Sequence, residues 1–232
     1  ENLTELSALV IKEKANFGIV VDPDVDRLAM VCEDGSMFGE EYTLVAVADF
    51  VLSKTPGNTV SNLSSTRALR DVTNSHNGNY QASAIGEVNV VEKMKATNAV
   101  IGGEGNGGVI YPELHYGRDA LIGVALFLTQ LAERKISVKE LRSSYPNYFI
   151  SKNKIELTPE VNVNAILSVL AEKYKKEKIT TIDGLKIDFA KGWVHLRKSN
   201  TEPIIRVYAE SEEEEKANEF AINMINEIKE LI

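Results

Sequence analysis

Apolar and polar residues follow one another along the first part of the chain in blocks that predict strands and helices in turn. Short β-branched apolar runs predict buried strands at Phe17–Val21, Thr59–Leu63 and Ala99–Ile101. Apolar residues at helical spacing predict helices at Glu41–Lys54 and Ala120–Ala132. Strands that alternate with helices are typical of a three-layer α/β domain with a mostly parallel sheet. We therefore expect a mixed three-layer α/β domain over residues 39–146.

The two ends of the chain do not continue this pattern. Thr4–Lys14 predicts a helix, and residues 28–38 predict a hairpin about Asp34-Gly35. One helix, one strand and one hairpin cannot close a core, so residues 1–38 are expected to be the truncated tail of a further α/β domain. Residues 147–232 predict strands before, between and after two helices, which is a small α+β domain.

Composition narrows the classes of protein and of partner. The 232-residue chain has 44% hydrophobic residues, as globular proteins do, and no apolar run approaches the roughly 20 residues of a membrane span. The first residues lack a basic region followed by an apolar core, so no secretory signal is expected. A single cysteine, Cys32, excludes an internal disulfide and favours a cytoplasmic location. The net charge of −8 argues against nucleic acid or an anionic membrane as a partner.

Three aspartates at alternate positions, Asp22, Asp24 and Asp26, follow the first predicted strand. Alternate side chains of a loop shaped by Pro23 can point to one side, so the carboxylates can converge there. Converged carboxylates repel one another unless a cation neutralises them, and Mg²⁺ prefers oxygen ligands of this kind. Two other interpretations stay open. One is a solvated acidic turn, and the other is a calcium loop of the EF-hand type, which is disfavoured because Arg27 occupies the position of its required glycine.

Two further segments carry candidate binding residues. Gly102–Gly108 follows a predicted strand, and its five glycines allow a ligand to approach the backbone closely. Its only hydrogen-bonding side chains, Glu104 and Asn106, suit vicinal sugar hydroxyls, although a loop that merely turns the chain is the alternative. A basic cluster between two later strands suits the oxygens of a phosphate monoester, with a plain surface loop as the alternative. Its members are Arg197, Lys198, Ser199, Asn200, Thr201 and Arg206.

The motifs DPDVDR, GEGNGG and RKSNTEP followed by IIRVY occur in this order and together resemble three loops of the α-D-phosphohexomutases, the phosphoglucomutase/phosphomannomutase superfamily. The resemblance implies that residues 1–38 end a metal-binding domain, that residues 39–146 bind the sugar and that residues 147–232 bind phosphate. It also implies Mg²⁺ on Asp22, Asp24 and Asp26, with Arg27 beside the site of phosphoryl transfer. The implied sugar contacts are Glu104 and Asn106, and the implied phosphate contacts are Arg197, Ser199, Asn200, Thr201 and Arg206.

The implied reaction moves a phosphate between C1 and C6 of a hexose phosphate through a phosphoserine enzyme and a hexose bisphosphate. Family members carry that serine in a domain that precedes these motifs, so this chain alone is expected not to complete the reaction. His115 and Arg118 are candidates for substrate contact or acid–base catalysis. Asn106 and Gly108 stand where many bacterial members have Ser and His, and the motif GEGNGG leans towards phosphoglucosamine rather than phosphoglucose or phosphomannose.

Two other functions stay open at this point. A magnesium-dependent sugar-phosphate hydrolase would explain the aspartates but not the distant basic cluster. A non-catalytic fragment that binds sugar phosphates would explain the binding residues without turnover. A homodimer is compatible with the sequence.

Overall fold

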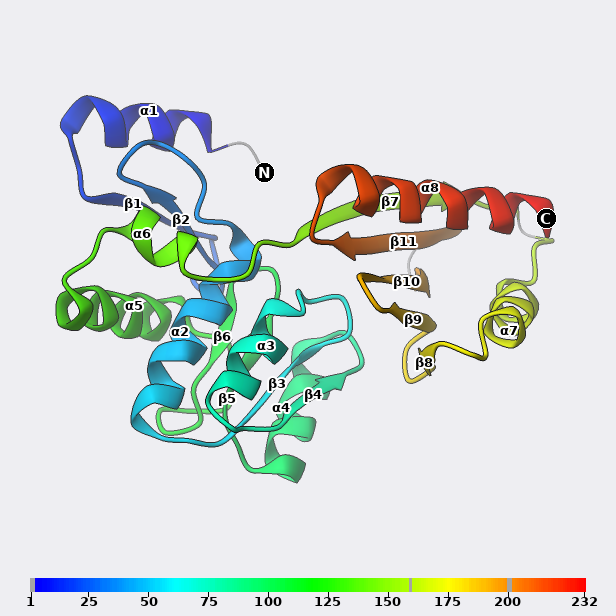
Figure 1. The fold of residues 1–232 in the computed structure, drawn as a ribbon, viewed down its shortest axis with the longest axis horizontal. Helices are drawn as coiled ribbons and strands as arrows, with labels where there is room; N and C mark the ends of the chain where they lie inside the picture. Colours follow the sequence, from blue (N-terminus) through cyan, green and yellow to red (C-terminus); the bar gives the residue numbers. More distant parts are fainter. Residues whose placement is uncertain (1–2, 159, 200–201) are drawn as a thin grey trace. The chain divides into compact units, whose positions relative to one another are not determined.

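The chain folds into two compact units, Glu1–Pro146 and Asn147–Ile232 (Figure 1). A computed structural model describes residues 3–158, 160–199 and 202–232. Helices alternate with strands in the first unit, whereas the second unit is built on one five-stranded sheet. The expected α/β fold with an α+β C-terminal part is confirmed. Among the described helices, none is both long and apolar enough to cross a membrane.

A four-stranded sheet in the order β4-β3-β5-β6 forms the centre of the first unit. Its strands are β3 (Asn58–Asn62), β4 (Tyr80–Ser83), β5 (Ala99–Glu104) and β6 (Gly108–Ile110). β3 runs parallel to both β4 and β5, and β6 pairs antiparallel with β5. The carboxyl ends of parallel strands lie at one edge of a sheet, so the loops that follow β3, β4 and β5 meet there.

Helices cover both faces of this sheet. The helices of this part of the unit are α2 (Glu40–Lys54), α3 (Ala68–Ser75), α4 (Glu87–Thr97), α5 (Ala120–Arg134) and α6 (Val138–Ser143), and both α5 and α6 pack on α2. On β5, a side chain at Gly102 would meet Met94 of α4, and a side chain at Gly103 would lie 3.2 Å from Leu44 of α2. Neighbouring residues of a strand point to opposite faces, so α4 and α2 lie on opposite faces of the sheet. The expected three layers are therefore present.

One helix and an antiparallel pair of strands precede the sheet: α1 (Thr4–Glu13), β1 (Phe17–Val21) and β2 (Leu28–Cys32). Phe38 packs edge-to-face on Phe127 of α5, with ring centroids 5.2 Å apart. Thr43 Oγ1 of α2 donates to the carbonyl oxygen of Leu28 at 3.1 Å. These contacts join the first 38 residues to the same compact unit as the sheet, and the expected domain boundary at residue 38 stays a prediction.

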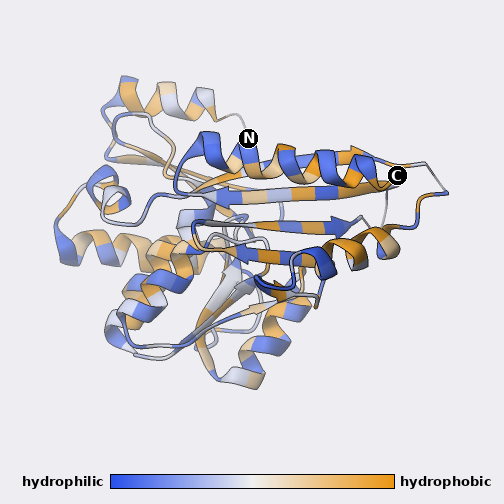
Figure 2. Cartoon of the chain, turned by 45° about the vertical axis from the view of Figure 1, so that its right-hand side comes forward, coloured by the Kyte–Doolittle hydropathy of each residue, from blue (hydrophilic) through white to orange (hydrophobic). Residues whose placement is uncertain are grey.

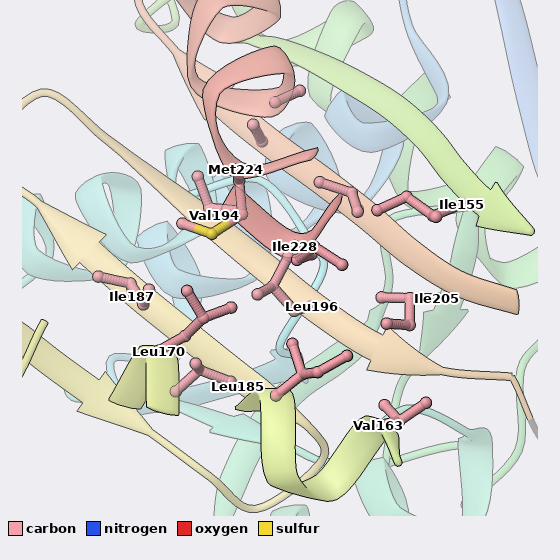
Figure 3. Packing of buried hydrophobic residues seen from close by; sticks show 14 residues of the cluster. Ile155, Val163, Leu170, Leu185, Ile187, Val194, Leu196, Ile205, Met224 and Ile228 are labelled. Atoms are coloured by element: carbon pink, nitrogen blue, oxygen red, sulfur yellow. The ribbon is translucent and has the colours of Figure 1, made fainter. Parts of the chain in front are cut away.

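The second unit is an antiparallel sheet in the order β7-β11-β10-β9-β8. Its elements are β7 (Phe149–Glu156), α7 (Val163–Lys173), β8 (Lys178–Thr180), β9 (Leu185–Phe189), β10 (Gly192–Lys198), β11 (Ile204–Ser211) and α8 (Glu214–Glu230). Hydrophobic and hydrophilic residues alternate along its strands (Figure 2). Val194 of β10 packs with Leu170 of α7 and Met224 of α8 in one apolar cluster (Figure 3). Both helices therefore cover one face, and alternate polar residues such as Arg197 point to the other.

His195 of β10 is a buried imidazole whose Nε2 lies 2.7 Å from the carbonyl oxygen of Asp183. Burial lowers its pKa from 6.5 to about 4, and the positive charges of Lys186 and Arg197 act in the same direction. Because the folded-state pKa lies below the unfolded value, the contribution of neutral His195 to the free energy of unfolding is fully present above pH 6.5. This contribution declines as the pH falls towards 4.

The free energy of unfolding of the second unit should therefore fall between pH 7 and pH 5 by about 2 kcal/mol more in the wild-type chain than in His195→Gln. Urea denaturation followed by the fluorescence of Trp193, the single tryptophan, measures this because Trp193 lies in β10. Glutamine retains a donor for the carbonyl oxygen of Asp183 but does not titrate. An equal pH dependence in the two proteins would contradict the prediction.

Candidate functional site

The loop between β1 and β2, residues 22–27, is named the aspartate loop here and is closed by Asp22. Oδ1 of Asp22 accepts the backbone N–H groups of Asp26 and Arg27, both at 3.1 Å, and Oδ2 accepts Nε of Arg27 at 2.7 Å. Desolvation opposes ionisation, but these hydrogen bonds outweigh it and hold the pKa of Asp22 well below its ordinary range. Val25 has a φ of +57°, which is strained for a β-branched residue.

Only one carboxylate oxygen of Asp26 accepts a hydrogen bond in the described structure. Oδ2 accepts Nη2 of Arg118 at 2.5 Å, whereas Oδ1 is buried and has no hydrogen-bond partner among the described residues. Burial and the neighbouring Asp22 raise the pKa of Asp26, and Arg118 opposes this shift. Asp24 is exposed. Within residues 3–158, 160–199 and 202–232, no three acidic, histidine or cysteine side chains are grouped to hold a metal ion, so the convergence of the three aspartates stays a prediction.

Arg118 connects the aspartate loop to the edge of the four-stranded sheet. Nη2 binds Asp26, Nη1 donates to Oε2 of Glu104 at 2.7 Å, and Nε lies 3.5 Å from Oε2 of Glu87. The backbone N–H of Arg118 donates to Oε1 of Glu87 at 3.0 Å. Only 19% of the Arg118 side chain is exposed. Carboxylates from three separate segments therefore surround one largely buried guanidinium.

Residues 104–108, named the glycine loop, join β5 to β6 and lie against the aspartate loop. The backbone N–H of Leu28 donates to the carbonyl oxygen of Gly107 at 3.0 Å. Gly107 has a φ of +86°, and a Cβ there would lie 2.2 Å from the carbonyl oxygen of Leu28. The backbone N–H of Ala120 donates to the carbonyl oxygen of Val25 at 3.1 Å. The aspartate loop is thus fixed by the glycine loop on one side and by the start of α5 on the other.

Glu104, at the end of β5, uses both of its carboxylate oxygens within the protein. Oε1 accepts Nδ2 of Asn62 at 2.9 Å and the backbone N–H of Gly86 at 3.2 Å, while Oε2 is paired with Arg118. Glu104 is only 4% exposed. Oδ1 of Asn106 accepts a backbone N–H of the glycine loop at 3.2 Å, and its Nδ2 makes no hydrogen bond to the part of the chain that is described. Of the two residues predicted to contact sugar, Asn106 is the one with a free donor.

Four residues of this site were not predicted from the sequence. They are Glu41, Asn62, Ser65 and Glu87. Oγ of Ser65 accepts the backbone N–H of Gly105 at 3.0 Å, and a Cβ at Gly105 would lie 1.9 Å from the carboxylate of Glu41. Asn62 ends β3 and Glu87 begins α4. For Asn62, Ser65 and Glu87 the common signal is a position at or near the carboxyl end of a parallel strand, where α/β proteins bind ligands. Glu41 lies in the first turn of α2 and carries no such signal.

A cavity of about 500 Å³ lies beside the aspartate loop. Asp22 and Arg27 line it together with Asn106 of the glycine loop and Glu40 at the start of α2, and apolar residues of β1 and β2 form much of the remainder. Ligand sites of small molecules have this size and this mixture of an apolar wall with few polar groups. Residues from both loops therefore face one common space.

His115 lies in the segment between β6 and α5. Its Nε2 is 3.1 Å from Oδ2 of Asp119, and Oδ1 of Asp119 accepts the backbone N–H of Ile122 at 3.0 Å, which caps α5. Burial opposes ionisation of Asp119, but these hydrogen bonds outweigh it and lower the pKa of the carboxyl. The His115 side chain is 48% exposed. An oriented, accessible imidazole can exchange protons, and the catalytic role of His115 stays a prediction.

Arg197 of β10 and Arg206 of β11 form a cross-strand pair, and Lys154 of β7 pairs with Arg206 from the other side. Directly paired residues point to the same face of a sheet. Nε of Arg197 donates to Oδ1 of Asp183 at 2.9 Å, while Nε of Arg206 is buried and unpartnered in the described structure. The three side chains form a row of positive charge, named the basic row. Lys154 was not predicted, because its place in the row depends on strand register.

Ser199 closes the connection between β10 and β11. Its backbone N–H donates to the carbonyl oxygen of Ile204 at 3.0 Å, and its Oγ accepts the backbone N–H of Glu202 at 3.3 Å. Only 5% of Ser199 is exposed. Asn200 and Thr201, which were predicted as phosphate contacts with it, lie outside the described residues.

Both units match one protein family. The α/β/α domain III of phosphoglucomutase/phosphomannomutase matches residues 39–148, and the C-terminal domain of phosphoglucomutase/phosphomannomutase matches residues 153–227. The chain belongs to the phosphoglucomutase/phosphomannomutase family. The resemblance inferred from the three sequence motifs is confirmed.

Two archaeal relatives extend this comparison. Phosphoglucomutase/phosphomannomutase of Thermococcus kodakarensis is 35% identical over 223 residues, which are 95% of this chain and 48% of the relative. Phosphoglucosamine/phosphogalactosamine mutase of Sulfurisphaera tokodaii is 32% identical over 237 aligned positions, which cover 100% of this chain and 51% of the relative. The chain spans about half the length of the curated relatives it matches.

Solved structures agree on the fold. A phosphoglucomutase/phosphomannomutase family protein of Burkholderia thailandensis superposes with a TM-score of 0.84 at 26% identity, over 98% of this chain and 49% of that one. N-acetylphosphoglucosamine mutase of Aspergillus fumigatus, solved with GlcNAc-6P and magnesium, superposes with a TM-score of 0.66 at 15% identity, over 90% of this chain and 51% of that one. The second likeness is one of fold alone.

Proposed function

We propose that this chain contributes metal, sugar and phosphate contacts to a phosphohexomutase, an isomerase that moves phosphate between C1 and C6 of a hexose phosphate. The observation that carries this proposal is the position of Arg118, which joins Asp26 of the aspartate loop to Glu104 of the glycine loop. Phosphoryl transfer depends on positioning the acceptor and on stabilising the charge of the transferring group, so a cation site beside a sugar site suits this reaction. The family membership and the names of the relatives support the same reaction class.

Magnesium is the proposed metal of the aspartate loop. The carboxylates of Asp22, Asp24 and Asp26 are oxygen donors suited to this hard cation, and the buried Oδ1 of Asp26 is an acceptor to which the described residues donate no hydrogen bond. Bound magnesium would stabilise the charge of the transferring phosphoryl group as a Lewis acid. Arg27, whose side chain is 47% exposed, would bind oxygens of the same group. The magnesium complex of the Aspergillus fumigatus enzyme supports this choice.

The basic row would hold the phosphate that does not react. Guanidinium groups form charge-assisted, bidentate contacts to phosphate oxygens, and Arg197 and Arg206 are a cross-strand pair that could share one phosphate group. Ser199, Asn200 and Thr201 of the connecting loop would add hydroxyl, amide and backbone donors. This set of donors can bind either phosphate of a hexose bisphosphate when the sugar reorients between the two transfers.

The free Nδ2 of Asn106 would donate to a hydroxyl of the hexose. Glu104 would reach the sugar only by exchanging one of its present partners, since Asn62, Gly86 and Arg118 occupy its two oxygens. His115, oriented by Asp119, is the proposed acid–base group. Phosphoglucosamine is the proposed substrate, which the GEGNGG motif and the name of the Sulfurisphaera tokodaii relative support.

Mutase activity of the phosphohexomutase that contains this chain tests the proposal. The enzyme, phosphorylated at its serine and supplied with magnesium, is assayed with glucosamine, glucose and mannose phosphates. Arg206→Ala should lower kcat/KM by about 100-fold, because charge-assisted hydrogen bonds to phosphate are lost. Lys178→Ala removes a positive charge from the exposed edge strand β8 and should change kcat/KM by less than about twofold.

Two results would contradict the proposal. One is release of inorganic phosphate without formation of an isomer, which is the behaviour of a hydrolase. The other is an Arg206→Ala enzyme whose kcat/KM equals that of Lys178→Ala.

A further inference from the structure

Arg118 is anchored on two carboxylates and paired with a third. Nη1 donates to Glu104 and the backbone N–H donates to Glu87, while Nε lies 3.5 Å from Glu87 and makes no hydrogen bond in the described structure. Glu104 ends β5 and Glu87 begins α4, so both anchors belong to the edge of the four-stranded sheet. Nη2 alone reaches Asp26, at 2.5 Å. Loss of the Asp26 contact would leave the guanidinium held by its two other partners.

Guanidinium groups neutralise part of the negative charge of the aspartate loop in this structure. Asp22 is paired with Nε of Arg27 at 2.7 Å, and Asp26 is paired with Arg118. Oδ1 of Asp26 has no hydrogen-bond partner among the described residues and forms a longer ion pair with Nε of Arg27 at 3.7 Å. A divalent cation and these guanidinium groups would bind the same negative charge, so they compete for it. This competition is a physical reason why the three aspartates are not grouped here.

Gly108 provides the space through which Arg118 reaches Asp26. A Cβ at Gly108 would lie 2.5 Å from Cδ and 3.2 Å from Cγ of Arg118. The φ of Gly108 is outside the left-handed region, so its backbone accommodates an alanine. The closest collision of the new methyl group would fall on the Arg118 side chain, which can move, and not on backbone. Alanine at this position would therefore displace Arg118 without changing the net charge.

We propose that Arg118 is the resident counter-ion of Asp26 and gives up this contact when a divalent cation binds to the aspartate loop. Nη2 then leaves Asp26 while Nη1 stays on Glu104. This role rests on the proposed function, which assigns magnesium to the loop. Arg118 is here a positioning residue, because it acts on the metal through Asp26. Metal binding and the Arg118–Asp26 contact are linked reciprocally, so weakening the contact strengthens metal binding.

Binding of Mn²⁺ to the chain, followed by the EPR signal of the free ion, tests this role with Mg²⁺ as a competitor. Gly108→Ala should bind Mn²⁺ about tenfold more tightly than wild type, because a charge-assisted hydrogen bond no longer has to be broken. Arg118→Lys should shift the affinity in the same direction, since one ammonium replaces two guanidinium nitrogens. Gly57→Ala is the matched control, because its Cβ would meet the side chain of Val100 at 2.6 Å, away from the aspartate loop, and it should leave the affinity unchanged.

Asp26→Asn separates the two ways in which the proposal can fail. If Asp26→Asn weakens Mn²⁺ binding while Gly108→Ala and Arg118→Lys bind no more tightly than wild type, the competition is refuted and the magnesium assignment stands. If Asp26→Asn leaves Mn²⁺ binding unchanged, the metal does not use this loop and both assignments are wrong.

Discussion

Replacement of Arg118 with alanine should lower the free energy of unfolding of the first unit by about 3–5 kcal/mol, the usual cost of removing one partner from a buried ion pair. Asp26, Glu87 and Glu104 would lose the cation that they share. The loss of the guanidinium costs the most free energy at Glu104. This carboxylate is only 4% exposed, so water cannot solvate it in place of the guanidinium. The aspartate loop would lose its side-chain contact to the sheet edge at the same time.

Urea denaturation followed by far-UV circular dichroism measures this loss. Arg70→Ala is the matched control, since Arg70 lies on α3 of the same unit and pairs with Asp71 at 3.0 Å with 37% and 26% of the two side chains exposed. This pair is partly exposed and joins two adjacent residues of one helix, so its loss should cost less than about 1 kcal/mol. Equal stability of the two variants would show that the Arg118 ion pairs do not stabilise the fold.

Replacement of Gly107 with alanine should destabilise the first unit by about 3 kcal/mol or more, through backbone strain and a collision together. The φ of +86° disfavours any residue with a Cβ, and that Cβ would lie 2.2 Å from the carbonyl oxygen of Leu28. The obstacle is backbone, so no rotation of a side chain relieves it. The hydrogen bond from the N–H of Leu28 to the carbonyl oxygen of Gly107 would be broken as the loops separate.

Gly117→Ala provides the comparison for this substitution. Its Cβ would lie 3.0 Å from Nδ1 of His115, a flexible and half-exposed side chain that can move aside. Its cost should be below about 1 kcal/mol. Thermal unfolding of the wild type and the two variants measures the difference in stability. A Gly107→Ala chain as stable as Gly117→Ala would show that the aspartate loop and the glycine loop are not in close contact.

Strong apolar periodicity predicted the two 15-residue helices of the first unit. The helix predicted at Glu41–Lys54 is α2, Glu40–Lys54, and the helix predicted from Ala120 is α5. The weakly patterned elements β4, α4, β6 and α6 were not predicted. β4 buries only Ser83, and α4 buries only Val90 and Met94. The other two are short, with three residues in β6 and six in α6. Elements of this kind are stabilised by pairing with their neighbours, which local sequence does not contain.

The sequence by itself determined which residue types stand at the site and in which order. Alternating aspartates after a strand, a glycine-rich turn and a basic connection between strands are local features, and their chemistry restricts the ligands to cations, hydroxyls and phosphate. Local spacing also determined that residues 104–108 can approach another backbone, because glycine alone tolerates the conformation of Gly107.

Tertiary structure alone decided how these residues are paired. Arg118 and Asp26 are 92 residues apart and meet only because the start of α5 packs on the aspartate loop. Lys154 joins the basic row through the register of β7 against β11. Both carboxylate oxygens of Glu104 are occupied because Asn62, Gly86 and Arg118 reach them from other segments of the chain. The charge balance of a carboxylate depends on whichever cations the fold brings within a few ångströms, and no local pattern in the sequence specifies them.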